Sequence, residues 1–270
     1  MKLSWLLAGQ YGFSAAFSLA RMMPPRAAEP AVTARASAST FWYENINHNS
    51  SAVYRNVKDM GAKGDGVTDD SAAIQKAINS KTAAGVVVYF PSGTYLVKSG
   101  LKGAAYAVLI GDPTNKPVIK ASASFSGTVL FAGQNAATIG LADYFHQVKN
   151  LIFDTTAVSP SKSITLISWS VSQGTQLQNL VFNMPIGATG HVGIASTGAN
   201  SPTFLNDLHF NGGGIGLSIT DTHYHFKNMY FNSPLSPVQC ELVPMLIQCR
   251  YDNRNENHST SNWYWSRISL

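Results

Sequence analysis

Residues 177–183 read LQNLVFN, a phrase that recurs along the chain. The other copies are VKNLIFD at 148–154, LNDLHFN at 205–211 and FKNMYFN at 226–232. The third residues of successive copies, Asn150, Asn179, Asp207 and Asn228, lie 29, 28 and 21 residues apart. A repeat of this length with one strand-like phrase per copy indicates a solenoid of stacked coils.

Apolar residues alternate with other residues in every copy, as Leu180 and Phe182 do in LQNLVFN. A period of two predicts a β-strand with one face turned inward. The longer leucine frame of leucine-rich repeats and the heptad-like runs of helical repeats are both missing. We therefore expect an all-β fold, a single-stranded right-handed parallel β-helix in which Leu stacks on Leu and Phe on Phe. An antiparallel sandwich with chance similarity between strands is the alternative.

The Asn or Asp that closes each phrase is expected where the chain turns. Its short polar side chain can bond local backbone groups and tolerates left-handed dihedral angles. Asp154 and Asp207 occupy positions that Asn fills in other copies. A structural role is therefore predicted for both carboxylates.

The segment before the repeats predicts the entry into the β-helix. Residues 56–60 are expected to be extended and to lead through a glycine-rich turn into a short capping helix at 71–79, SAAIQKAIN. The β-branched and aromatic run Val86–Phe90 predicts a strand. Pro91, Ser92 and Gly93 then form a turn before Thr94–Val97, so these two strands are expected to form a hairpin.

Residues 57–70, VKDMGAKGDGVTDD, gather four carboxylates and raise the question of a catalytic acid cluster. Asp65 lies among glycines of a sharp turn, and Asp69 directly precedes the helix, where an N-cap residue accepts free amide hydrogens. Asp69 and Asp70 would also lie at the positive end of the helix dipole. We therefore expect Asp65, Asp69 and Asp70 to form a structural cap. A calcium loop is excluded because Gly61 and Lys63 stand where ligands are required.

Composition narrows the function classes. The chain has 270 residues and a formal net charge of +5, but its Lys and Arg residues form no run, so no nucleic-acid partner is expected.

Residues 1–39 resemble a secretory leader followed by a propeptide or linker, and their apolar stretch is too short and interrupted to span a membrane. Sequons at Asn49 and Asn257 are compatible with secretion. Cys240 and Cys249 could pair in an oxidising compartment, but their spacing does not decide this.

Three polar or aromatic residues outside the repeat strands are candidates for contact with a substrate. Gln173 and His191 lie just beyond strand phrases, where side chains can face a groove, and Trp169 could stack against a sugar ring. Core filling by Trp169 and a structural role for His191 are the alternatives. No metal site is expected, because His223 and His225 lack further ligands nearby. No adjacent repeats present the pair of carboxyl groups that glycoside hydrolysis requires.

Several stretches of the chain together carry a resemblance to a known family: FWYENINH at 41–48, YRNVKDMGAKGDGVTDDSAAIQKAIN, VVYFPSGTYLV, and the block from LISW through NLVFNMP, HVGI and FNGGGIG. With these stretches the chain resembles glycoside hydrolase family 55, the fungal exo-β-1,3-glucanases. The GAKGDGVTDD part alone resembles the entry segment of many pectate-lyase-superfamily (pectin-lyase-like) β-helices. Together the match covers roughly residues 41–232.

The resemblance implies a secreted, extracellular hydrolase that needs no metal or cofactor, acts on β-1,3-glucan with inversion, and is a monomer at full length. Family members place two β-helices in tandem with the cleft between them, and the general acid belongs to the second. Gln173 matches a family Gln that helps to position the attacking water. Nothing in this sequence matches the acid, so we expect an incomplete chain.

The expected organisation is a leader at 1–39, the β-helix at 40–232 and an irregular tail at 233–270. The tail holds both cysteines and neither repeat period, and residues 233–261 look like an inserted segment, such as a translated intron, before the Trp-rich WYWSRISL. Two further functions remain open. One is a non-catalytic polysaccharide-binding β-helix, and the other is a pectate-lyase-like or polygalacturonase-like enzyme on acidic polysaccharide.

Overall fold

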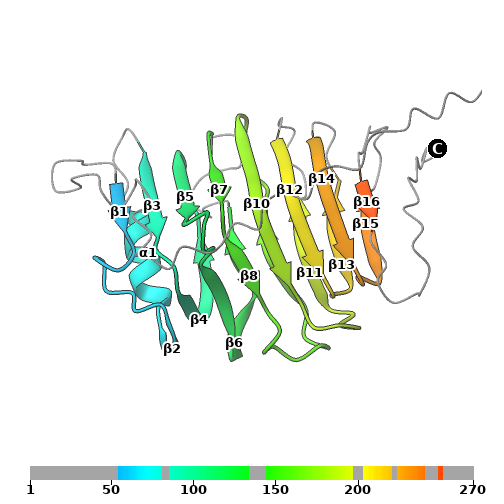
Figure 1. Ribbon diagram of the computed structural model, residues 1–270, viewed down its shortest axis with the longest axis horizontal. Coiled ribbons are helices and arrows are strands. Elements are labelled where there is room, and N and C mark those ends of the chain that lie inside the picture. The colour runs from blue at the N-terminus through cyan, green and yellow to red at the C-terminus, as the bar shows by residue number, and fades with distance from the viewer. Residues whose placement is uncertain are drawn as a thin grey trace, which may run out of the picture. The chain divides into compact units, whose positions relative to one another are not determined.

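The computed structural model describes residues 54–80, 85–133, 144–196, 203–220, 224–240 and 249–251. These residues form a parallel β-helix with one short helix, which confirms the predicted fold class (Figure 1). The elements are β1 Tyr54–Asn56, β2 Asp65–Asp69, α1 Ser71–Asn79, β3 Val86–Phe90, β4 Thr94–Lys102, β5 Ala107–Gly111, β6 Val118–Ala132, β7 Gln147–Lys149, β8 Ile152–Asp154, β9 Ile164–Ser168, β10 Thr175–Asn183, β11 His191–Ser196, β12 Thr203–Asn211, β13 Ile215–Ile219, β14 Tyr224–Asn232, β15 Ser236–Cys240 and β16 Cys249–Tyr251.

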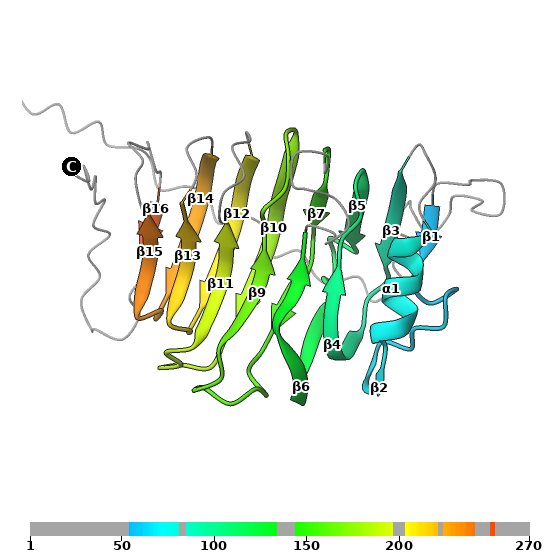
Figure 2. The same cartoon turned by 180° about the vertical axis from the view of Figure 1, so that it is seen from behind.

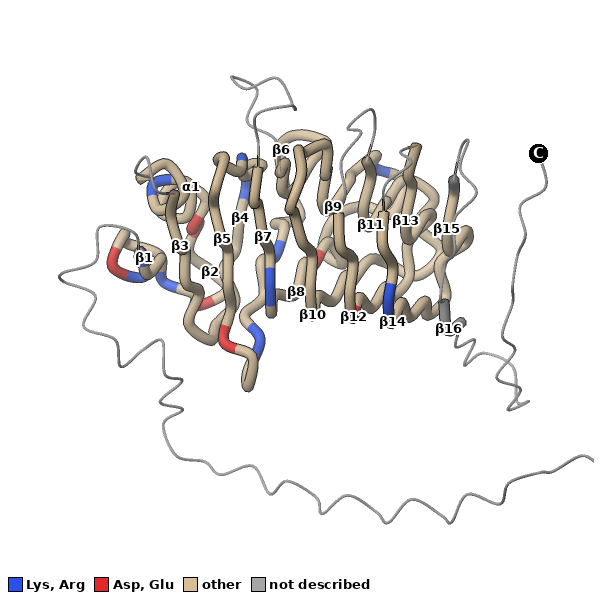
Figure 3. The backbone as a smooth tube through the Cα atoms, turned by 90° about the horizontal axis from the view of Figure 1, so that it is seen from above, with Lys and Arg blue, Asp and Glu red and all other residues tan. Residues whose placement is uncertain are grey.

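The strands of successive coils pair in parallel, and their pairing divides them among three faces of the stack. Figure 3 shows the same row of coils from above. Face A contains β1, β3, β5, β7 and the first halves of β10, β12 and β14. Face B contains β2, the first halves of β4 and β6, then β8, the second halves of β10, β12 and β14, and β16. Face C contains the second halves of β4 and β6, then β9, β11, β13 and β15.

The predicted stacking of the repeat phrases is confirmed. Leu180 pairs in register with Leu208, and Phe182 with Phe210, and all four side chains are fully buried. The Phe182 ring lies 5.8 Å from Phe153 and 4.7 Å from Phe210, nearly parallel to both. Because these coils repeat the same apolar pattern, the rings of Phe153, Phe182, Phe210 and Phe231 form one continuous stack in the core.

The left-handed residues lie at a different position of the phrase from the one predicted. The closing residues end their strands, whereas the third residues, Asn150, Asn179, Asp207 and Asn228, have φ of 57°, 55°, 59° and 54°. At these positions the chain turns from face A to face B within the phrase, and Asn and Asp tolerate the left-handed region better than most residues. The side-chain amide of Asn179 also donates to Asn150 Oδ1 of the neighbouring coil at 2.8 Å.

The entry segment differs from the expectation at two points. Helix α1 is confirmed, and Asp69 Oδ1 accepts the N–H of Ser71 in its first turn at 3.1 Å, as predicted. The N-cap position itself is Asp70, whose side chain makes no capping bond. The Asp70 carboxylate is buried and accepts the backbone N–H groups of Lys63 and Gly64 at 2.6 and 3.0 Å. Asp70 therefore fixes the glycine-rich loop, because a buried carboxylate needs such donors.

The strands around Pro91–Gly93 do not form the predicted hairpin. Strand β3 pairs with β1 and β5 on face A, while β4 pairs with β2 and β6, and all of these pairs are parallel. The turn is thus a corner between two faces of one coil. The sequence of a short turn does not distinguish a hairpin from a corner between two faces, since both need the same turn residues.

Helix α1 lies at the β1 end of the stack beside β4, as Figure 2 shows. Its Ile74 and Ile78 side chains are buried in the core. The Gln75 amide accepts the Lys102 N–H at 2.8 Å and donates to the Lys102 carbonyl at 2.9 Å. Ser71 Oγ accepts the Lys98 N–H at 3.0 Å. Side chains of the helix therefore bond the backbone of the outermost strand of face C.

The predicted irregular tail contains two strands that continue the stack. Strand β15 pairs with β13 on face C, and β16 pairs with β14 on face B. In β16, Cys249 lies opposite Met229 and Tyr251 opposite Phe231. Sequence reasoning missed this strand because Cys and Tyr replace the usual Leu and Phe. That residues 233–261 are an inserted segment stays a prediction.

Several predictions fall outside the described residues. These are the leader at 1–39, the segment 41–48, the sequons at Asn49 and Asn257, the His223 position and the final WYWSRISL. The side chains of Cys240 and Cys249 also lie outside the described part, so their pairing stays a prediction.

Candidate functional site

Gln173 is exposed in the turn between β9 and β10, at the corner where face C passes into face A. Its backbone carbonyl accepts the N–H of Phe145, which occupies the same corner one coil earlier, at 3.1 Å. The side-chain amide offers two donors and an acceptor to the solvent. The location is compatible with the predicted contact with a substrate.

Three aromatic residues lie at this same corner on the two preceding coils, and with Gln173 we call them the aromatic corner: Tyr106, Tyr144 and Phe145. The ring of Phe145 lies 6.0 Å from Tyr106 and 6.2 Å from Tyr144. Tyr106 is 44% exposed and Phe145 is 57% exposed, so both rings present a large surface to solvent. Exposed, grouped aromatic rings are unusual because burial would stabilise them.

The backbone at the aromatic corner is held in a left-handed conformation. Equivalent positions of four coils are Gly85, Tyr106, Phe145 and Gly174, with φ of 95°, 61°, 56° and 71°. Glycine adopts this region freely, but a bulky side chain there is a strained outlier. Strain of this kind costs about 1–3 kcal/mol and concentrates at functional sites.

Gly174 explains how the Phe145 ring is placed beside Gln173. A Cβ atom at Gly174 would lie 2.7 Å from Phe145 Cδ1, which is closer than atoms approach. The absence of a side chain at 174 therefore lets the ring lie against the next coil. The aromatic corner joins flat apolar surfaces to one exposed amide, an arrangement suited to a sugar ring, which has apolar faces and a polar rim.

Trp169 is fully buried, so the prediction that it stacks against a sugar is wrong. Its ring fills the space left by Gly133 on the neighbouring coil, where a Cβ atom would lie 2.6 Å from Trp169 Cε3. The ring also meets His146 edge-on at 6.0 Å. Trp169 is therefore a core residue, as the alternative interpretation held.

His191 is also fully buried at the start of β11, so it is not a substrate contact on the surface. Its Nε2 lies 2.9 Å from the Ser159 carbonyl, and its Nδ1 lies 2.9 Å from Thr155 Oγ1. Because a carbonyl can only accept, Nε2 carries the proton and Nδ1 accepts the hydroxyl hydrogen. Burial lowers the pKa of His191, which favours this neutral ring.

Sequence reasoning missed Tyr106, Tyr144 and Phe145. The only local signal is an aromatic residue directly before a strand, in AAYA at 104–107 and DYFH at 143–146. Their equivalence becomes visible once the register places Val108 opposite Gln147 and Gln147 opposite Gln176.

The fold and the sequence point to one family. Residues 54–248 match the family described as rhamnogalacturonase A/epimerase, pectate lyase-like. The chain belongs to this family.

Proteins similar to this chain include fungal ones with glucanase names. The chain is 36% identical over 231 residues to a "Probable glucan endo-1,3-beta-glucosidase" of Arthroderma benhamiae, covering 74% of this chain and 26% of the relative. It is 34% identical over 231 residues to "Non-secreted LysM effector LysM19" of Penicillium expansum, covering 77% and 18%. The chain thus spans about a quarter or less of the length of these relatives. The predicted resemblance to β-1,3-glucanases is confirmed.

A solved structure shows the same fold. The A-module of mannuronan C-5 epimerase AlgE6 from Azotobacter vinelandii matches with a TM-score of 0.51 and 21% identity, over 66% of this chain and 50% of that one. At this identity the likeness supports the pectate-lyase-like β-helix and says nothing about the reaction.

Most acidic side chains in the described part of this pectate-lyase-like chain bond to their own structure. Asp65 accepts the N–H groups of Val67 and Thr68, and these bonds lower its pKa to about 2. Burial acts to raise the pKa of Asp69, but hydrogen bonds from Ser71 lower it overall. A glycosidase general acid needs the opposite, a raised pKa.

The later carboxylates also have local partners. Asp112 accepts bonds from Ser92 and Thr114, Asp154 from Thr156, and Asp207 lies 3.6 Å from His209 Nε2. The described ranges contain no group of three or more His, Cys, Asp or Glu side chains that could hold a metal ion. In the same ranges no helix has the length and apolar character needed to cross a bilayer.

Proposed function

We propose that this chain is part of a secreted, extracellular β-1,3-glucan hydrolase of the inverting type, and that the glucan passes over the aromatic corner. The single observation that carries the proposal is that Gln173 and the exposed rings of Tyr106 and Phe145 share one corner of the β-helix. The glucanase names of its relatives support the same substrate.

The chemistry of the corner favours a neutral glucan over an acidic polysaccharide. All four residues of the aromatic corner are uncharged, and an anionic sugar held there would find no cation among them. Aromatic rings can cover the apolar faces of pyranose units, while Gln173 bonds hydroxyl groups at the edge. In this proposal the Gln173 amide also orients the attacking water.

The general acid is proposed to come from a part of the full-length glucanase relatives that this chain does not span. An inverting hydrolase needs two carboxyl groups about 6.5–9.5 Å apart, with room for water between them. The aromatic corner itself has no carboxylate, and the described ones near the repeats bond Thr156 and His209 instead. We therefore expect the chain to bind laminarin without cleaving it.

The test measures binding and reducing ends together for the purified chain, with laminarin and with polygalacturonate. Laminarin binding without reducing-end release is expected. Binding of polygalacturonate alone would overturn the proposed substrate. Reducing ends released from laminarin would show that this chain contains the general acid and would overturn its assignment to sequence that the chain does not span.

Glycine variants make this test independent of folding. Because Gly85 and Gly174 occupy the equivalent corner positions, Tyr106→Gly and Phe145→Gly should keep the backbone and even relieve strain. We expect each to weaken laminarin binding about fivefold or more, the value of one lost aromatic contact, with an unchanged or higher unfolding midpoint.

Tyr230→Ala is the matched control, since that ring lies outside the corner on face B, stacked on His209. Equal laminarin affinity of the corner variants and the wild type would refute the aromatic corner as the binding site.

A non-catalytic glucan-binding protein is the second candidate. It is favoured by the local bonding of the described carboxylates and by the relatives named LysM effectors. Reducing-end release separates the two. If a chain extended to the length of the glucanase relatives binds laminarin and does not cleave it, the binding protein is the right description. Recovery of the protein from culture medium or from cells tests the secreted location.

A further inference from the structure

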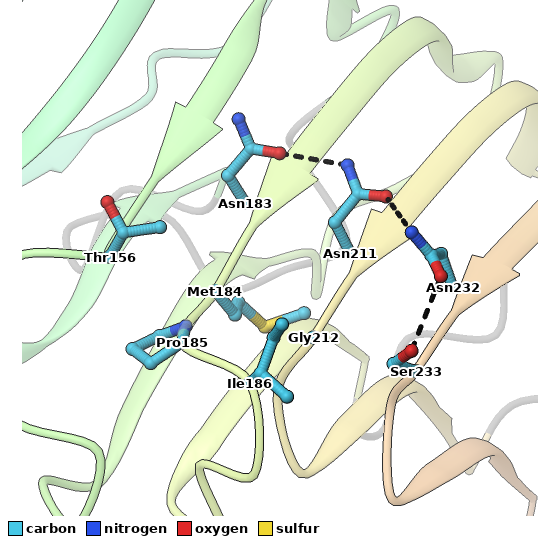
Figure 4. A pocket seen from close by; sticks show the side chains of 9 residues that line it. All are labelled: Thr156, Asn183, Met184, Pro185, Ile186, Asn211, Gly212, Asn232 and Ser233. Atoms are coloured by element: carbon cyan, nitrogen blue, oxygen red, sulfur yellow. Dashed lines mark hydrogen bonds between the residues drawn. The ribbon is translucent and has the colours of Figure 1, made fainter. Parts of the chain in front are cut away.

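A hollow lies at a different corner of the β-helix from the aromatic corner, where face B passes into face C. It has a volume of about 330 Å³ and opens beside the ends of β8, β10, β12 and β14. We call it the asparagine groove, and Figure 4 shows its lining: Thr156, Asn183, Met184, Pro185, Ile186, Asn211, Gly212, Asn232 and Ser233. The aromatic corner lies at the C-to-A turn, so the two features are separate.

The asparagine side chains of the groove form a ladder across three coils. Asn211 Nδ2 donates to Asn183 Oδ1 at 2.9 Å, and Asn232 Nδ2 donates to Asn211 Oδ1 at 3.5 Å. Each of these bonds uses one of the two N–H groups of an amide, so a second N–H remains on Asn211 and on Asn232. Asn183 Nδ2 donates to no acceptor among the described residues, although it lines the groove.

An apolar wall faces this row of amides. Met184 and Pro185 form part of it, and Ile186 projects with 80% of its side chain exposed. Gly212 permits the arrangement, because a Cβ atom there would lie 2.4 Å from the Met184 carbonyl oxygen. The loop that carries the wall therefore rests directly on the next coil and leaves the hollow open.

The chemistry of the lining selects a class of ligand. None of the nine lining residues is charged, so an ionic group entering the hollow would lose water without gaining a counter-ion. Amides repeated at the coil spacing of about 4.8 Å can donate to and accept from successive hydroxyl groups. Ile186 and Pro185 can cover the apolar face of a pyranose ring. These properties together fit an uncharged oligosaccharide.

We propose that the asparagine groove is a second glycan-binding site, which takes a short neutral oligosaccharide independently of the aromatic corner. The probe is laminarihexaose, with cellohexaose as a second neutral glycan and a galacturonate oligomer as the acidic comparison. The proposal does not depend on hydrolysis, and its ligand class follows from the groove alone.

Asn183→Asp is the decisive variant. A carboxylate keeps the acceptor that receives the Asn211 amide, so the ladder is retained, but it removes the unbonded Nδ2 donor. Ile186→Ser removes the exposed apolar wall, and Val67→Ser, at a side chain 78% exposed on β2, is its matched control. We expect Asn183→Asp and Ile186→Ser each to weaken the binding of laminarihexaose at the groove roughly fivefold to tenfold, the effect of one lost contact. Val67→Ser should leave this binding unchanged.

Two-dimensional NMR assigns the effects to a site. Addition of laminarihexaose should shift the side-chain amide signals of Asn183, Asn211 and Asn232, and these shifts should persist in Phe145→Gly. Shifts confined to the Gln173 region would contradict binding at the groove. Equal shifts of the Asn211 and Asn232 amides in the wild type and in Asn183→Asp would contradict it as well. Neither result would argue against binding at the aromatic corner. Loss of the Gln173 shifts alone would overturn the corner and leave the groove. Stronger shifts with the galacturonate oligomer would contradict the neutral ligand class.

Discussion

His191 shows how a single buried side chain links stability to pH. Its ring is held between Thr155 and the Ser159 carbonyl, and the fold keeps it neutral because burial lowers its pKa below the usual 6.5. In the unfolded chain the same ring takes up a proton near pH 6.5. The unfolded state therefore binds more protons than the folded state as the pH falls below that value.

We predict that the free energy of unfolding decreases as the pH is lowered from about 6.5 toward the depressed pKa of His191. The slope for one proton is at most about 1.4 kcal/mol per pH unit. Well above pH 6.5 the ring is neutral in both states, so this residue adds no slope there. Asp65 and Asp69 do not contribute to the slope between pH 5.5 and 7.5, because their pKa values are lowered from 3.8 and they titrate at lower pH.

Urea unfolding at pH 7.5, 6.5 and 5.5 checks this prediction against His191→Gln. The variant is expected to be less stable at every pH, because Thr155 and Ser159 lose their partner, but its slope across this range should be flatter. Parallel curves for the two proteins would show that another group carries the pH dependence.

At the scale of elements, helix α1 replaces a strand pair at the edge of face C. Gln75 bonds both backbone groups of Lys102, and Ser71 accepts the N–H of Lys98. An open strand edge presents unpaired N–H and C=O groups that promote association. The helix therefore contributes hydrogen bonds to β4 as well as the apolar burial of Ile74 and Ile78.

Gln75→Ala is predicted to lower the free energy of unfolding by about 1–3 kcal/mol, because two backbone groups of Lys102 lose their partner. Lys76→Ala, at the exposed neighbouring position of the same helix, should stay within about 0.5 kcal/mol of the wild type. Urea denaturation of the three proteins gives the comparison. If both variants unfold at the same urea concentration, the Gln75 bonds are not stabilising.

The extent of sequence-based prediction also becomes clear at the level of elements. Strand β3, helix α1 and the buried Leu180 and Phe182 columns follow from local periodicity, which one segment of chain displays by itself. The aromatic corner does not, because its column joins Tyr106, Phe145 and Gly174, residues of different type at unequal spacing. Only the pairing register between coils reveals such a column. The burial of Trp169 likewise depends on a glycine on the neighbouring coil.

At the scale of the whole β-helix, stability is carried from coil to coil by the aromatic stack. Phe182 contacts Phe153 below and Phe210 above, and Phe210 in turn lies 5.0 Å from Phe231. In stacked repeats each coil contacts only its neighbours, so stability is approximately a sum of coil terms and interface terms. A defect in the stack should therefore spread only to adjacent coils.

Phe182→Ala is predicted to lower the free energy of unfolding by about 3–5 kcal/mol, through the cavity it leaves. Hydrogen exchange should show the largest loss of protection in β8, β10 and β12, with little change in α1. Phe204→Ala, at a ring 51% exposed on the outer surface, is the control and should change protection little. A uniform loss from α1 to β14 would instead show that the whole β-helix opens as one cooperative unit.

The Gln75 side chain has a consequence for assembly. Its amide presents the same donor and acceptor pair that a further strand would offer to Lys102, so it occupies a place where a second molecule could otherwise add a strand. Stacked coils of similar sequence can in principle be extended by further strands, and the Gln75 amide blocks such an addition at this edge. Growth of the sheet into a fibre from this edge of face C would first have to displace that side chain.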